Sequence, residues 1–224
     1  LASMWAIATL GLPLWANLAL AVGAGVASGS GLTVGHELGH KPDWPAQLGA
    51  KLVNAVTGYA HFCIEHNRGH HIMVATPEDP ASARFGENVY RFALRELPGT
   101  ARRGWAMERD RLTKKGLPFW HWRNDLLQGY AITLAVAIAL ALWLGPWVLP
   151  FVVLHHFVGW LQLTLANYVE HYGLLRRKLP SGRYEPCQPH HSWNTNHIAS
   201  NLMLFHLQRH SDHHANPLRP YQAL

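Results

Sequence analysis

The chain has 224 residues, of which 49% are hydrophobic and 14% are charged. This length allows one sizeable domain, and the charge content is below the quarter that is typical of soluble proteins. The formal net charge of +6 is accounted for by the membrane topology inferred below. We expect no nucleic-acid partner, because such surfaces combine basic residues on one face with aromatic stacking platforms. The two cysteines form no Cys-x-x-Cys motif, which excludes a zinc ribbon or an iron–sulfur knuckle.

Two long segments carry no charged residue, and each is long enough to cross a bilayer, which takes roughly 20 apolar residues. The first runs from Met4 to Val34 and the second from Leu126 to Val169. Gly145-Pro146, near the middle of the second segment, predicts a turn between two helices. The expected fold is therefore an all-α, polytopic transmembrane helical bundle, with spans at about 4–34, 126–144 and 147–168.

The chain begins with Leu1 rather than Met, and its first segment lacks the basic start and cleavage site of a signal peptide. We therefore expect an N-terminally truncated part of a larger membrane protein, forming a single membrane-embedded domain over 1–224. All 19 Lys and Arg lie within 41–123 or 176–219, on one side of the expected hairpin. The positive-inside rule makes that side cytoplasmic, so the expected cytoplasmic parts are 35–125 and 169–224.

Two connecting segments have distinct compositions. The run from Ala50 to Ile64 is apolar enough to pack as a helix at the membrane surface. The segment from Thr76 to Gly116 is polar, with many Arg and several Pro and Gly, and we expect an irregular connector with short helices.

Nine of the 17 histidines lie in four short clusters, all within the expected cytoplasmic parts. His36 and His40 are four residues apart, which places both imidazoles on one helical face, and His66 and His70 repeat the spacing. Imidazole is the commonest metal ligand, and nine are too many for one ion with four to six ligands. We therefore expect two metal ions in one pocket at the cytoplasmic helix ends. All-nitrogen ligation suits Zn, Cu, Fe or Ni and does not choose among them.

The first cluster, His36-Glu37-Leu-Gly-His40, also matches the H-E-x-x-H signature of zinc proteases. A catalytic zinc needs three protein ligands and a water molecule. Six further clustered histidines would then have no role, so we reject a metalloprotease.

Several polar residues beside the clusters are candidates for supporting the ligands. Neighbours on a helix point in different directions, so each carboxylate is expected to face a histidine other than the one beside it and to fix its tautomer and orientation. Histidines within an apolar span, His155 and His156, are expected to line a cavity or bond a neighbouring helix. His190, His191 and His197 are expected to be structural or to face an electron donor, and His61 and His121 to be packing or surface residues. The supporting candidates are Glu37, Glu65, Glu170, Asp212 and His206.

The motifs resemble those of the integral-membrane alkane 1-monooxygenases, the bacterial alkane hydroxylases, from about Thr33 to the C-terminus. The matching boxes include His36-Glu-Leu-Gly-His-Lys41, Glu65-His-Asn-Arg-Gly-His-His71 and Leu207-Gln-Arg-His-Ser-Asp-His-His214. Three histidine boxes alone are typical of any membrane desaturase or hydroxylase. The box Asn167-Tyr-Val-Glu-His-Tyr-Gly-Leu174 narrows the resemblance to hydrocarbon hydroxylases.

The resemblance implies a six-helix membrane protein with a non-haem di-iron centre. It implies hydroxylation of the terminal carbon of medium- or long-chain n-alkanes by O₂ at the bacterial inner membrane, with the active site facing the cytoplasm. Electrons would come from rubredoxin, with rubredoxin reductase upstream. The ligands carried over by position are His36, His40, His66, His70, His71, His171, His210, His213 and His214.

Two other functions remain open from the sequence. One is a membrane fatty-acyl desaturase or related hydroxylase that uses the same iron chemistry, and the other is a non-catalytic metal-binding or transport protein. The chain has no motif to store electrons, so a separate carrier must dock. An acidic rubredoxin would be attracted to the basic residues Arg102, Arg103, Arg109, Arg111, Lys114 and Lys115.

Overall fold

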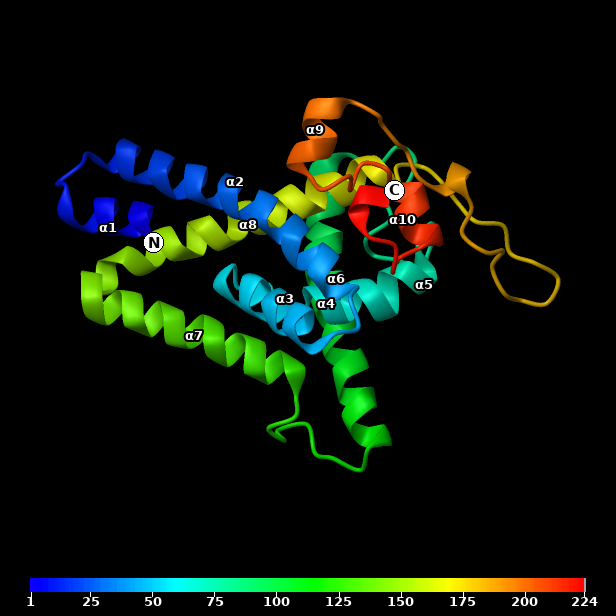
Figure 1. Ribbon diagram of the computed structural model, residues 1–224, viewed down its shortest axis with the longest axis horizontal. Helices are drawn as coiled ribbons and strands as arrows, with labels where there is room; N and C mark the ends of the chain where they lie inside the picture. The colour runs from blue at the N-terminus through cyan, green and yellow to red at the C-terminus, as the bar shows by residue number, and fades with distance from the viewer. Residues whose placement is uncertain (224) are drawn as a thin grey trace.

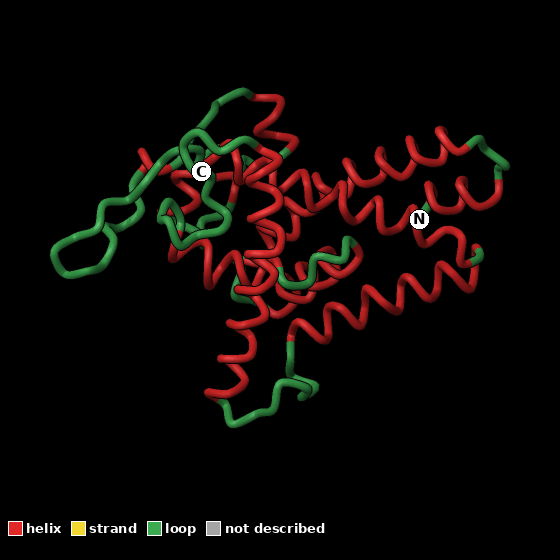
Figure 2. The backbone as a smooth tube through the Cα atoms, turned by 180° about the vertical axis from the view of Figure 1, so that it is seen from behind, coloured by secondary structure: helices red, strands yellow, loops and turns green. Residues whose placement is uncertain are grey.

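The computed structural model describes residues 1–223, and no strand is present within that range. Three long helices run side by side, and a fourth crosses one end of them (Figures 1 and 2). The three are α2 (Leu14–Gly39), α7 (Asp125–Leu144) and α8 (Leu149–Glu170), each apolar and long enough, with the short η2 (Pro146–Val148) leading into α8, to span a membrane. The expected all-α membrane fold is therefore confirmed.

The first apolar segment is divided into two helices, where one span over 4–34 was expected. The short α1 (Ala2–Thr9) folds back against α2 and α7. Gly11 has φ of +60°, a conformation that glycine adopts without strain, and Pro13 lacks the N–H that a continuous helix would need. The hairpin turn lies where it was expected, since Gly145 has φ of +91° between α7 and η2.

Small residues bring α2 and α8 close together. Gly25 and Gly29 form a Gly-x-x-x-Gly pattern on α2, and they face Gly159 of α8. This pattern lets two membrane helices approach closely. A Cβ at Gly25 would lie 2.9 Å from the backbone oxygen of His155, which cannot move aside as a side chain can.

Gly25→Ala is therefore expected to destabilise the protein by about 1–3 kcal/mol through overpacking. Gly23→Ala, on the same helix with nothing within 4 Å of its added Cβ, is the matched control and should not lower stability, because alanine favours a helix over glycine. Thermal unfolding of both purified variants in detergent tests this, and an equal midpoint for the two would contradict the close packing.

A helix over 50–64 was expected at the membrane surface, at the ends of the long helices. The segment after α2 instead enters the space between those helices. It consists of α3 (Trp44–Val56), a turn, and α4 (Phe62–Glu65). Asp43 caps α3, accepting a hydrogen bond from the Ala46 amide at 3.0 Å. The turn is possible because Gly58 has φ of +69°, and α3 packs against α2 and α7.

The last carbonyls of α3 lie at depth between the spans, where lipid offers no hydrogen-bond donor. Three side chains of the spans supply the donors. Thr133 bonds the Ala55 oxygen at 2.6 Å, His156 the Val56 oxygen at 3.1 Å, and Trp160 the Thr57 oxygen at 2.8 Å. Thr133 is roughly 12 Å along α7 from its start at 1.5 Å per residue, so the turn lies well inside the span. This explains one of the two histidines within α8; the other, His155, is 2.7 Å from the Ser28 hydroxyl of α2.

The expectation of an irregular connector over 76–116 holds for 76–88 and is wrong for most of the remainder. Residues Val89–Lys114 form α6, the helix that crosses the ends of the spans (Figure 1). Asn88 caps it by accepting a hydrogen bond from the Arg91 amide. Buried residues recur at every fourth position of α6, the spacing of one helical face. Two of them are acidic, so the amphipathic pattern of the helix is weak in the sequence. These buried residues form one stripe: Phe92, Glu96, Thr100, Gly104, Glu108 and Leu112.

The remaining elements are short and gather at the same end. The second histidine cluster lies on η1 (His66–His70) and α5 (His71–Met73). After α8 the chain continues through η3 (Pro189–His191), α9 (Ile198–Met203), α10 (His210–Ala215) and η4 (Tyr221–Ala223).

Candidate metal centre

The nine clustered histidines converge at the end of the bundle where α6 crosses it. They form two groups, and within each group the candidate ligand atoms all lie within 4.8 Å of one another. The elements that carry these candidate ligands are the end of α2, the pair η1 and α5, the end of α8, and α10. The first group is His36, His40, His66, His71 and His213; the second is His70, His171, His210 and His214.

A π-helical turn determines how the histidines within 66–71 divide between the two groups. A π-helix has i→i+5 hydrogen bonds and occurs often at functional sites. Here η1 spans His66–His70, so His66 aligns with His71, and their Nε2 atoms are 3.0 Å apart. His70 turns toward the other group. In a regular α-helix, the i,i+4 spacing would have placed His66 and His70 in one group. Here they fall in different groups.

The nitrogen positions fit two metal ions better than they fit hydrogen bonding. His71 Nε2 lies 3.0 Å from His66 Nε2 and 3.1 Å from His213 Nε2, while His210 Nε2 lies 3.0 Å from His171 Nε2 and 2.9 Å from His214 Nε2. Each such atom carries one proton or one lone pair, so these contacts cannot all be hydrogen bonds. Ligands at about 2.1 Å from a metal lie about 3.0 Å apart when they are at right angles.

Three further ring nitrogens strengthen this fit. The Nε2 atoms of His36, His40 and His70 are buried and have no hydrogen-bond partner among residues 1–223. A buried polar atom without a partner costs free energy, and a bound metal ion would supply the missing interaction.

Burial keeps the ring nitrogens available as ligands. It lowers the pKa of His171 to about 3 and, together with the charge of Lys41, that of His40 to about 4. Burial and neighbouring histidines also hold the pKa values of His66, His210 and His214 well below the usual range. These imidazoles are therefore neutral at pH 7, the form that binds a metal.

Two ligand candidates are oriented through their other ring nitrogen. His70 Nδ1 is 2.9 Å from Asp79 Oδ2, and His171 Nδ1 is 3.2 Å from the backbone oxygen of His191. A proton on each Nδ1 satisfies these acceptors and leaves the Nε2 lone pair directed at the site.

Asp79 is part of a buried charge network that sequence reasoning missed. It accepts hydrogen bonds from Ser82 at 2.6 Å and from Arg103 at 2.6 Å, and Arg103 also binds Glu65. Burial alone would raise the pKa of Asp79, but His70 and Arg103 hold it below its ordinary value. No spacing rule connects Asp79 to the histidine boxes. Arg103, expected on a docking surface, instead faces the interior.

The predicted supporting residues differ in what they contact. Glu170 Oε2 lies 3.4 Å from His210 Nε2, and Glu65 is linked to His70 through Arg103 and Asp79. By contrast, Glu37 pairs with Lys41 at 2.7 Å and Asp212 with Arg219 at 2.7 Å. The ring of His206 packs edge-on against Tyr221.

The other histidines have contacts outside the two groups. His61 Nδ1 is 2.7 Å from the Tyr130 hydroxyl, and His121 accepts a hydrogen bond from the Arg123 amide. His191 is buried beside Glu185, whereas His190 and His197 are exposed.

An apolar cavity of about 370 Å³ opens beside the centre, between α2, α8 and the segment 193–208. Gly29 and Thr33 of α2 and Leu163 and Ala166 of α8 line it, and Glu170 stands at the boundary between the cavity and the second histidine group. The cavity lies between two helices that can span a membrane, so it is suited to an apolar molecule.

Known proteins share sequence with most of this chain. The family described as fatty acid desaturase matches residues 13–224. The alkane 1-monooxygenase of Pseudomonas putida is 52% identical over 99% of the chain and 55% of its own length, and alkane 1-monooxygenase 1 of Alcanivorax borkumensis is 53% identical over the same shares. The hydroxylase component XylM of xylene/toluene monooxygenase from Pseudomonas putida is 28% identical over 82% of the chain and 48% of its own length. The chain spans about half the length of these curated relatives. It belongs to the fatty acid desaturase family.

Proposed function

We propose that this chain is the catalytic part of a membrane monooxygenase that hydroxylates the terminal carbon of medium- or long-chain n-alkanes to 1-alkanols. The observation that carries the proposal is the pairing of two adjacent histidine groups with an apolar cavity between spanning helices. An alkane has no polar group to bind, so it must be held by apolar contacts and can enter from lipid.

The nine histidines would hold two iron ions, which when bound supply the activation of O₂ that a strong C–H bond requires. The chain's own residues orient and confine the reaction. Leu163 and Ala166 line the space for the alkane, while Glu170 stands between this space and His210. Asp79 and the His191 backbone hold two rings in place. Eight of the nine histidines are buried, which keeps bulk water away from the centre.

We propose rubredoxin, reduced by rubredoxin reductase, as the electron donor, on the strength of the motif resemblance. Of the six basic residues of α6 and its C-cap expected to attract it, Arg102, Arg109, Lys114 and Lys115 are exposed. Arg103 and Arg111 are held in ion pairs with Glu65 and Glu108, and the Lys114 end of α6 leads away from α10 (Figure 1). We place the active site on the cytoplasmic side of a bacterial inner membrane, because all Lys and Arg lie outside the hairpin turn.

The test is turnover of octane by the full-length protein with rubredoxin, its reductase and O₂. The expected product is 1-octanol, with two irons per chain by metal analysis. An alkene or internal alcohol from an acyl substrate would instead identify a desaturase or related hydroxylase. Fewer than two irons and no O₂-dependent product would favour a non-catalytic metal-binding protein.

A further inference from the structure

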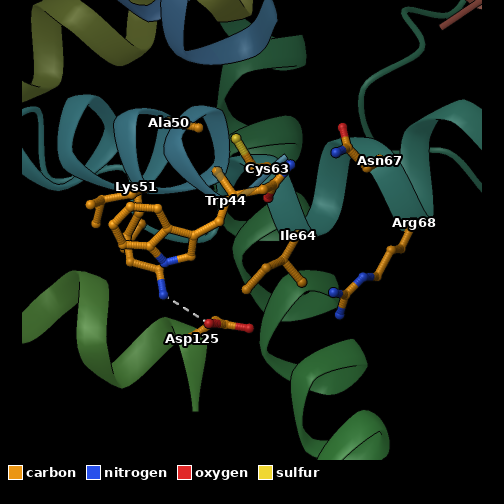
Figure 3. Close-up of a pocket in the computed structure, with 11 residues that line it drawn as sticks. Trp44, Ala50, Lys51, Cys63, Ile64, Asn67, Arg68 and Asp125 are labelled. Carbon is orange, nitrogen blue, oxygen red and sulfur yellow. Dashed lines mark hydrogen bonds and ion pairs between the residues drawn. The ribbon is translucent and has the colours of Figure 1, made fainter. Parts of the chain in front are cut away.

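A second cavity, of about 220 Å³, lies on another side of the bundle, between α3, α4 and the start of α7. Figure 3 shows Lys51 beneath Trp44 at one side, Arg68 at the other, and Ile64 between them. Lys51 reaches across to Asp125, the first residue of α7, at 2.8 Å. The mechanism uses none of these residues.

The cavity lies at the level where the membrane begins. It is at the first turn of α7, a candidate span, and Trp120 and Trp122 just before that helix are 78% and 70% exposed. Exposed tryptophans flanking a span mark the headgroup region of a bilayer. Arg111, near the end of α6, lies 3.4 Å from Asp125 and so belongs to this same region, where cations face acidic lipids.

An apolar track leads from the cavity along α3. Four exposed side chains recur every fourth residue and so share one helical face. Because the end of α3 lies well inside the spans, this face passes from the headgroup level into the apolar layer. The exposed side chains are Trp44, Leu48, Leu52 and Val56.

The charges around the cavity favour an anion. Asp125 is already paired with Lys51 at 2.8 Å and with Arg111 at 3.4 Å. Arg68 is 48% exposed, and its single ion pair within residues 1–223 is a long one, 3.7 Å to Glu108. Arginine offers five N–H donors in a fork that matches phosphate, and lysine has three donors, of which two are used here by Asp125 and Gln128.

We propose that this cavity binds an anionic phospholipid, with its phosphate between Arg68 and Lys51 and an acyl chain along the exposed face of α3. None of the nine histidines lines this cavity, although Arg68 lies on η1 between His66 and His70. The proposal does not depend on the proposed catalytic function. The cations at the headgroup level match the phosphate of such a lipid, and the apolar face that continues from the cavity matches its acyl chain.

The experiment is native mass spectrometry of the full-length protein, delipidated in detergent and titrated with phosphatidylglycerol or phosphatidylcholine. We expect phosphatidylglycerol to be retained preferentially. Arg68→Gln should weaken that retention about fivefold, the effect of one cation at a membrane surface. Because Arg68 is half exposed and weakly paired, this variant should fold normally, as its thermal midpoint will show.

Arg91→Gln is the matched control, since it removes an exposed cation from the opposite end of α6 and should leave retention unchanged. Trp44→Ala should weaken retention through the apolar face. The proposal would be overturned if the two lipids were retained equally, or if Arg91→Gln weakened retention as much as Arg68→Gln. It would also be overturned if no lipid bound because another part of the full-length protein covers the cavity. If inorganic phosphate raised the thermal midpoint as much as phosphatidylglycerol does, the cavity would be a site for free anions, and the proposal would also be overturned.

Discussion

His171→Ala in the full-length protein is expected to reduce the metal content from two ions to about one per chain and to abolish alkane hydroxylation. His171 is fully buried in the second group, and its loss leaves His70, His210 and His214 there. The five histidines of the first group are untouched. Losing a residue that only orients a ligand lowers metal affinity or activity by about 10–100-fold, so losing the ligand itself should exceed that.

Metal analysis and octane turnover measure the two effects, and membrane fractionation checks that the variant still inserts. His197→Ala, which removes an exposed imidazole outside both groups, is the control and should retain both metals. Full activity with two metals in the His171 variant would show that this residue is not a ligand.

Asp79→Ala is expected to have the second-largest effect, a loss of about 10–100-fold in metal affinity at the second group. His70 Nδ1 would lose its acceptor, and Arg103 would keep Glu65 as its remaining acidic partner. Breaking a buried ion pair from one side also costs about 3–5 kcal/mol of stability. Chelator competition measures the affinity, and thermal unfolding measures the stability separately.

Asp79→Asn separates the two causes. Its amide oxygen can still accept from His70 Nδ1, while the charge facing Arg103 is gone. It should therefore recover metal affinity more than stability. If Asp79→Asn and Asp79→Ala lost metal equally, the carboxylate would not act by orienting His70. Asp110→Asn, at a side chain that is 66% exposed, should change neither quantity.

Local patterns in the sequence predicted which histidines converge, but not how they divide. The histidine pairs and the Gly145 turn could be read from spacing, because both depend on neighbours within one helical turn. The assignment of His70 to the second group depends on a π-turn in η1, and nothing in the spacing distinguishes that turn from an α-turn.

Long-range contacts explain the rest of what was missed. Asp79 and Arg103 meet although they are far apart in sequence, and neither lies in a motif. The buried stripe of α6 includes Glu96 and Glu108, which are satisfied by partners on other elements: Thr164 for Glu96 and the Asp125 amide for Glu108. A pattern search that counts only apolar residues cannot detect such a face.

The inserted turn after α3 makes chain length a constraint on the metal centre. The segment between His40 and His66 begins and ends at a candidate ligand, and its middle is fixed by the hydrogen bonds of Thr133, His156 and Trp160. One extra residue in α3 or α4 would rotate the following part of the helix by about 100°. Either these three hydrogen bonds or a ligand would then lose its position. The stretch between the first two histidine boxes therefore has a fixed length, unlike an ordinary surface loop, in which insertions are tolerated.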